Sequence, residues 1–135
     1  MTDELILVVD DNPLNLKLAR LLLAAEGYHV RTAEDARQAL AVLEVLHPRL
    51  ILMDIQLPGM DGLELTRNLR ANPALDDVII VALTAYAMRE DEPRALDAGC
   101  DGYIAKPMDT RSLPDMVRGY LDGQVPRGAR LSSGN

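Results

Sequence analysis

The sequence lacks the side chains on which several kinds of protein depend. Its 135 residues include no Phe and no Trp, and Cys100 is the only cysteine. A single cysteine excludes a framework of internal disulfides and a zinc site built on several cysteines, and it fits a reducing compartment. Because Phe and Trp are absent, the core must be aliphatic. The length of the chain suits one domain.

Basic clusters and long apolar runs are also missing. The formal net charge is −7, and Lys and Arg are scattered through the part expected to fold, so direct binding to nucleic acid or to an anionic membrane is not expected. The apolar run at residues 5–9 has no basic stretch before it and is too short for a signal peptide or a membrane span. We therefore expect a cytoplasmic protein.

Five short apolar segments alternate with segments of helical periodicity. The predicted strands are residues 5–9, 28–32, 50–53, 78–83 and 102–105. Continuously apolar strands are typical of a parallel sheet that is buried on both faces. The sequence therefore predicts an α/β fold, (βα)5, with a doubly wound five-stranded parallel sheet in the flavodoxin-like order 2-1-3-4-5.

Helix boundaries follow from capping residues and prolines. Asn12 and Pro13 are typical of an N-cap and first helical position. Apolar residues recur at helical spacing after them and again later in the chain: Leu14, Leu18, Leu21, Leu22 and Ala25, then Ala36, Leu40, Leu43 and Leu46. Pro93 predicts that the fourth helix begins near Glu92, after a loop at residues 85–91, and Pro114 must lie in the first turn of the last helix or kink it. We expect a folded domain at residues 1–121 and a flexible tail or linker at 122–135.

Polar residues follow four of the five predicted strands. They are Asp10 and Asp11 after the first, Asp54 after the third, Thr84 after the fourth, and Lys106 with Pro107 after the fifth. In a doubly wound sheet these positions converge at the carboxyl edge, where ligands bind. Three neighbouring carboxylates repel one another unless positive charge compensates, and a divalent cation together with Lys106 could provide it.

The donor set indicates which cation this would be. Carboxylate oxygens without nearby His or Cys favour Mg²⁺, or Mn²⁺, over zinc. We expect Asp11 as a direct ligand, Asp10 as a direct or water-mediated ligand, and Asp54 and the backbone carbonyl of Gln56 to complete the set. With Lys106 and the Thr84 hydroxyl nearby, Asp54 could attack a phosphoryl group and form an aspartyl phosphate.

Four motifs resemble the receiver domain of bacterial two-component response regulators: "VVDDN", "LILMDIQLPGMDGLEL", "ALTA" and "YIAKP". The resemblance covers residues 5–121 and is closest to single-domain regulators of the chemotaxis and cell-cycle type and to hybrid-kinase receivers. It implies that Asp54 accepts phosphate from a histidine kinase or histidine phosphotransfer protein, in a two-component system or phosphorelay. Asp10 and Asp11 would bind Mg²⁺, and Lys106 would contact the phosphoryl group.

The same resemblance implies a switch. Thr84 would be its hydroxyl, Tyr103 its aromatic residue, and the bond between Lys106 and Pro107 would be cis. A downstream protein partner would bind the face formed by the fourth helix, fifth strand and fifth helix. Such a protein catalyses only its own phosphorylation and slow dephosphorylation, so we do not class it as an enzyme.

Two other functions are compatible with parts of the pattern. A Mg²⁺-dependent phosphatase would also form an aspartyl phosphate, but such enzymes place a second carboxylate two residues after the nucleophile, and Gln56 occupies that position. A receiver scaffold could instead bind partners independently of phosphorylation, which the complete acidic set argues against. The sequence does not specify the kinase, the output partner, the pathway, the oligomeric state or whether the chain is part of a longer regulator.

Overall fold

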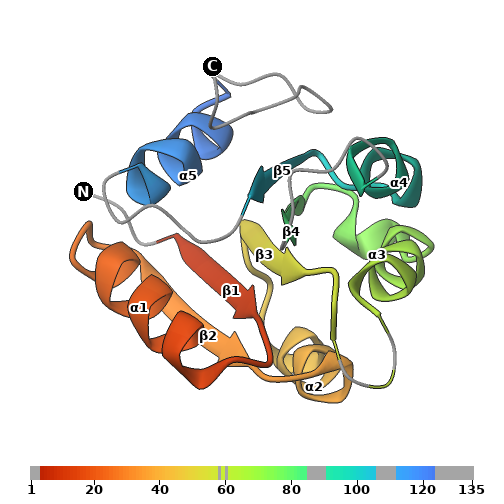
Figure 1. Ribbon diagram of the computed structural model, residues 1–135, viewed down its shortest axis with the longest axis horizontal. Coiled ribbons are helices and arrows are strands. Elements are labelled where there is room, and N and C mark those ends of the chain that lie inside the picture. Colours follow the sequence, from red (N-terminus) through yellow and green to blue (C-terminus); the bar gives the residue numbers. More distant parts are fainter. Residues whose placement is uncertain (1–3, 58, 60, 85–90, 106–111, 124–135) are drawn as a thin grey trace.

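The computed structural model describes residues 4–57, 59, 61–84, 91–105 and 112–123, and shows an alternating α/β chain (Figure 1). Its strands are β1 (Leu5–Val9), β2 (His29–Ala33), β3 (Leu50–Asp54), β4 (Ile79–Thr84) and β5 (Gly102–Ala105). Its helices are α1 (Pro13–Ala24), α2 (Ala36–Val45), α3 (Gly62–Arg70), the 3-10 helix η1 (Pro73–Leu75), α4 (Asp91–Ala98) and α5 (Leu113–Leu121). All neighbouring strands are parallel and the order is β2-β1-β3-β4-β5, so the predicted fold and topology are confirmed.

Helices cover both faces of the sheet. Helices α1 and α5 lie on one face, and α2, α3 and α4 lie on the other (Figure 1). Successive β1 residues alternate between the two apolar layers: Leu7 packs on the α2 to α4 side and Val8 on the α1 and α5 side. Both sides of each central strand therefore need apolar residues, which explains the continuous runs in the sequence.

The start of α1 is as predicted, and only some of its periodic apolar residues are buried. The Asn12 side chain caps the helix by accepting hydrogen bonds from the backbone N–H groups of Leu14 and Asn15. The buried residues of the helix are Leu16, Ala19 and Leu23, whereas Leu14 and Leu21 are 71% and 60% exposed. Leucines occur at six of the twelve positions of α1 and form two overlapping stripes, so periodicity alone does not fix the rotation of the helix about its axis.

Both unusual prolines lie in first turns. Helix α4 begins at Asp91, one residue before the predicted start, and Pro93 is its third residue. Helix α5 begins at Leu113 and has Pro114 at its second position. A proline there removes no intrahelical hydrogen bond, because the first N–H groups of a helix have no partner within it. The loop predicted before α4 falls mainly on residues 85–90, outside the described residues.

The carboxyl end of the domain is described as far as Gly123. Helix α5 ends at Leu121, and most of the predicted tail, residues 124–135, lies outside the described residues, so the division at 121 stays a prediction. Within the described part of the chain, no helix is both long and apolar enough to cross a membrane.

Candidate functional site

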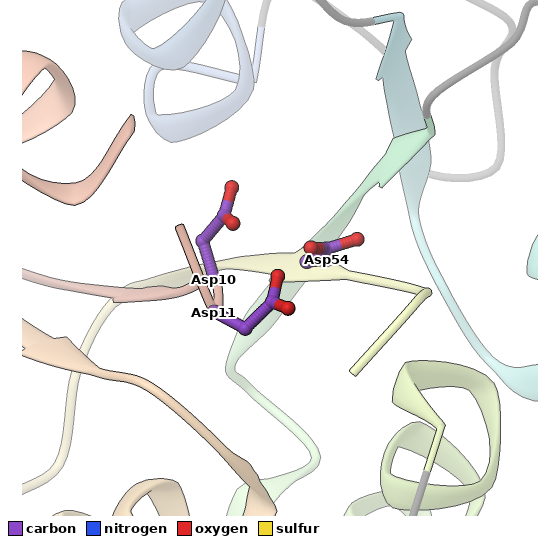
Figure 2. Close-up of side chains that lie close together, drawn as sticks. All are labelled: Asp10, Asp11 and Asp54. Carbon is purple, nitrogen blue, oxygen red and sulfur yellow. The ribbon is translucent and has the colours of Figure 1, made fainter. Parts of the chain in front are cut away.

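Three aspartates meet at the carboxyl edge of β1 and β3. These strands are direct neighbours, with Val9 opposite Met53, so the residues that follow them emerge side by side. One carboxylate oxygen from each of Asp10, Asp11 and Asp54 lies within 4.8 Å of the other two. Figure 2 shows the three side chains together at this edge. The predicted convergence of these three residues is confirmed.

The aspartates differ in exposure. Asp10 is 0% exposed and Asp54 is 2% exposed, whereas Asp11 faces solvent. At 4.8 Å and an effective dielectric constant of about 20, two carboxylates repel each other by about 3.5 kcal/mol. Two buried charges and a third beside them need nearby positive charge, and an oxygen-only set of this kind fits Mg²⁺. The residues present therefore fit the predicted cation.

Local hydrogen bonds orient the two buried carboxylates. Asp10 accepts one from the Asn12 backbone N–H at 2.9 Å and one from the Asn15 side-chain amide at 3.3 Å. Asp54 accepts one from the backbone N–H of Gln56 at 2.9 Å, through its Oδ1 atom. The first turn of α1 and the loop after β3 thus hold the carboxylates in place.

Gly62 packs against the backbone of Asp54 and helps to set its position. A Cβ atom at this glycine would lie 2.1 Å from the Asp54 carbonyl oxygen and 2.7 Å from the Ile55 Cα atom. The N–H of Gly62 donates to the Ile55 carbonyl at 3.1 Å. The first turn of α3 therefore packs directly on the backbone that carries Asp54, and only glycine leaves room for this contact.

The remaining predicted residues are described in part. Gln56 is exposed, and its N–H makes the contact with Asp54, so the metal-binding role of its carbonyl stays a prediction. Thr84 ends β4 opposite Ala105, at the same edge of the sheet, but its side chain is outside the described part. Lys106 and Pro107, and with them the cis bond, lie outside the described residues.

Tyr103 is buried. It is 6% exposed, and it belongs to the apolar layer on the α4 side, which also contains Ala82, Ala95 and Ala98. The small alanine side chains leave space for an aromatic ring. Its role as the switch aromatic stays a prediction.

Sequence reasoning missed two residues that shape the site. Asn15 lies one helical turn from the cap of α1, so its spacing from Asp10 could have indicated the contact. Gly62 is the first residue of α3, and its close neighbour is the backbone of Asp54, which the local sequence does not indicate. Gly59 has φ +80, a conformation that favours glycine for a different reason.

Comparison with known proteins identifies the family. The family model of the response regulator receiver domain matches residues 6–118. The chain belongs to this family. Receiver domains are phosphorylation-dependent signalling switches that interact with histidine kinases and with downstream partners, and they bind Mg²⁺ at an acidic site. The predicted resemblance is therefore confirmed.

Several relatives resemble this receiver domain over most of its length. The polar-differentiation response regulator DivK of Brucella ovis is 40% identical over 116 residues, which are 86% of this chain and 94% of DivK. A CheY-like receiver domain from Methanospirillum hungatei JF-1 is 35% identical with a TM-score of 0.81, covering 91% of this chain and 97% of its own. The receiver domain of a sensor histidine kinase from Pseudomonas aeruginosa PAO1 is 36% identical with a TM-score of 0.81, covering 90% and 99%, and has a magnesium ion coordinated in its active-site cleft.

Proposed function

We propose that this receiver domain accepts a phosphoryl group on Asp54 and is thereby switched for binding to a protein partner. The observation that supports this most directly is the cluster of Asp10, Asp11 and Asp54, which brings three carboxylates within 4.8 Å of one another at a sheet edge. Asp54 is the buried member that ends a central strand, and its orientation is fixed by the Gln56 N–H.

The Asp54 carboxylate would supply the nucleophile. We expect one of its oxygens to attack the phosphorus atom of a phosphohistidine while the bond between phosphorus and the histidine nitrogen breaks and that nitrogen takes a proton from solvent. Asp10 and Asp11 would hold Mg²⁺, or Mn²⁺, which neutralises charge on the phosphoryl oxygens when bound. The resemblance implies that Lys106 and the Thr84 hydroxyl would contact the same oxygens.

The proposed partners are a histidine kinase or histidine phosphotransfer protein as donor and a protein that binds the face of α4, β5 and α5. Two relatives support a kinase as the donor: DivK is a response regulator, and the Pseudomonas domain belongs to a sensor histidine kinase. Tyr103 on β5 would be the switch aromatic. We further propose that the protein is cytoplasmic, does not bind nucleic acid directly, and catalyses only its own phosphorylation and slow dephosphorylation.

Acetyl phosphate or beryllofluoride with Mg²⁺ provides the test. We expect NMR shift changes around Asp54, Thr84 and Tyr103 in the wild type, and one phosphoryl group per chain by mass spectrometry. Asp54→Asn should abolish both, whereas Asp61→Asn, an exposed carboxylate in the same loop, should abolish neither. Phosphorylation of Asp54→Asn at wild-type yield would contradict the assignment.

The two other functions make different predictions in the same assay. A phosphatase would release many equivalents of phosphate from a phosphate ester, whereas this chain, which takes its phosphoryl group from phosphohistidine or acetyl phosphate, should not turn over an ester. A phosphorylation-independent module would bind its partner equally as wild type and as Asp54→Asn in the presence of donor. We expect the wild type alone to change affinity when donor is added.

A further inference from the structure

Arg70, the last residue of α3, connects three parts of the domain through its guanidinium group. Its Nε donates to the Gly99 carbonyl at 2.8 Å, just after α4. Its Nη1 donates to the carbonyls of Leu75 at 3.2 Å and Val78 at 2.8 Å, on the path from η1 to β4. Its Nη2 forms an ion pair with Asp101 at 2.7 Å, just before β5. One side chain thus binds the ends of α3 and α4 and the approaches to β4 and β5.

Asp101 makes this connection firm. Its side chain is only 8% exposed and the Arg70 side chain is 18% exposed. The carboxylate oxygen that pairs with Arg70 also accepts a hydrogen bond from the Ile80 N–H at 2.9 Å, and the Asp101 N–H donates to the Ile80 carbonyl at 2.7 Å. Charge-assisted hydrogen bonds shielded from water are stronger than neutral or exposed ones.

The carboxyl end of α4 is fitted to Arg70. Gly99 adopts φ +111, and it and Cys100 close the helix by donating to the carbonyls of Leu96 at 3.1 Å and Ala95 at 3.0 Å. A Cβ atom at Gly99 would lie 2.5 Å from the Arg70 Cγ atom. The positive φ and the close side chain both require glycine here.

Few large apolar side chains hold the described part of α4. At residues 94–98, Ala95 and Ala98 are buried and Leu96 is half-buried, whereas Arg94 and Asp97 are exposed. A buried methyl group contributes roughly 0.8 kcal/mol, far less than a buried leucine or isoleucine. The polar contact between Arg70 and the Gly99 carbonyl, just beyond the carboxyl end of the helix, therefore adds to a modest apolar contact.

We propose that Arg70 is a positioning residue of the switch: it fixes the carboxyl end of α4, so that α4 responds to phosphorylation by rotating about Gly99 and not by sliding along the sheet. This inference rests on the proposed function, because it requires an event at Asp54 to which α4 responds. On the face of α4, β5 and α5, helix α4 would then have a fixed end at Gly99 and a responsive end at Asp91. The part of α4 that a partner senses would be the part nearer the phosphorylation site.

Residual dipolar couplings of the amides at residues 94–98, referred to those of β1 and β3, measure the direction of the α4 axis. On addition of beryllofluoride and Mg²⁺ to the wild type, we expect the axis to rotate while NOEs between the Arg70 side chain and Gly99 persist. A displaced helix with an unchanged axis, loss of these NOEs, or no movement of α4 while Asp54 and Gln56 signals shift would overturn the proposal. Unchanged Asp54 and Gln56 signals would count against the proposed function itself.

Substitutions test the fixed end without any phosphoryl mimic. Arg70→Met should raise hydrogen exchange at the Gly99 and Cys100 amides about tenfold or more, because the charged hydrogen bonds that hold this end are lost. Arg70→Lys, which keeps the charge but lacks the planar fork, should give a smaller increase and a folded protein even if Arg70→Met does not fold. Arg67→Met, an exposed arginine on the same helix, is the matched control and should leave these amides unchanged. Wild-type exchange at Gly99 and Cys100 in both Arg70 variants would also overturn the proposal.

Discussion

Replacing Gly62 with alanine should disturb both the fold and Asp54, the proposed phosphoacceptor. The added Cβ atom would lie 2.1 Å from the Asp54 carbonyl oxygen and 2.9 Å from its carbonyl carbon. Both are backbone atoms of a buried central strand, so no flexible side chain can move aside. Either the first turn of α3 shifts away from β3 or the backbone of Asp54 shifts toward the site.

Two opposing effects decide the size of the change. Alanine within a helix is favoured over glycine by about 1 kcal/mol, whereas overpacking a core typically costs about 1–3 kcal/mol and more when backbone must move. We expect the clash to prevail and to lower the free energy of unfolding by about 2 kcal/mol. A shift of about 1 Å in a reacting group can cost about 100-fold in rate, so phosphorylation by acetyl phosphate should slow by a comparable factor.

Gly59→Ala separates this effect from the general cost of replacing a loop glycine. Gly59 has φ +80, and no atom lies within 4 Å of the position that a Cβ would take, so alanine there should cost about 1–2 kcal/mol through backbone conformation alone. Urea unfolding and the phosphorylation rate should be measured for both variants. If Gly62→Ala were as stable as the wild type and phosphorylated at the same rate, the assigned contact between α3 and Asp54 would be wrong.

Three further predictions concern charge and burial. With EDTA present, Asp54→Asn should raise the free energy of unfolding by about 2 kcal/mol, because one member of a repelling cluster is neutralised. In urea titrations Mg²⁺ should stabilise this variant less than the wild type. A loss of stability of the variant in EDTA would refute the electrostatic account. Burial raises the pKa of the Cys100 thiol from 9.0 to about 11. Because the unfolded thiol ionises first as the pH rises, the free energy of unfolding of the wild type should fall by up to about 3 kcal/mol more than that of Cys100→Ala between pH 9 and pH 11. Below pH 9 the stabilities of the two proteins should depend on pH in the same way. The Tyr120 hydroxyl is buried and makes no hydrogen bond of good geometry among the described residues, and it lies 1.8 Å from the position that a Cβ of residue 102 would take. Tyr120→Phe should therefore be as stable as the wild type or up to about 1 kcal/mol more stable. Thermal unfolding should also show that Tyr120→Phe partly rescues Gly102→Ala.

Residue patterns that act locally, or that sheet topology brings together, could be predicted from the sequence. Asn12 caps α1 as expected, because capping depends on neighbouring residues alone. Asp10 and Asp54 meet because parallel strands in a doubly wound sheet all point their carboxyl ends the same way. The site could therefore be anticipated from strand order without knowledge of any side-chain contact.

Features that depend on tertiary packing could not be predicted in this way. The buried face of α1 depends on which of two leucine stripes meets the sheet, and Leu14 belongs to the exposed one. The pair of Arg70 and Asp101 joins residues 31 positions apart, and each looks like an ordinary surface charge in its own segment. The neighbour of Gly62 becomes evident only when α3 is placed against β3.

The adjacency of β1 and β3 also makes cation binding a report on how much of the chain has folded. The aspartate doublet follows β1, but its third carboxylate arrives only when Asp54 docks beside it, after β2 and α2 have been built in between. A nascent chain that ends before Leu50, or a refolding chain in which β3 has not yet docked, has two solvated aspartates and lacks the third metal ligand. The refolding rate should thus depend on Mg²⁺ only from the step that joins these two strands. Binding of the ion therefore reports when the centre of the sheet has assembled.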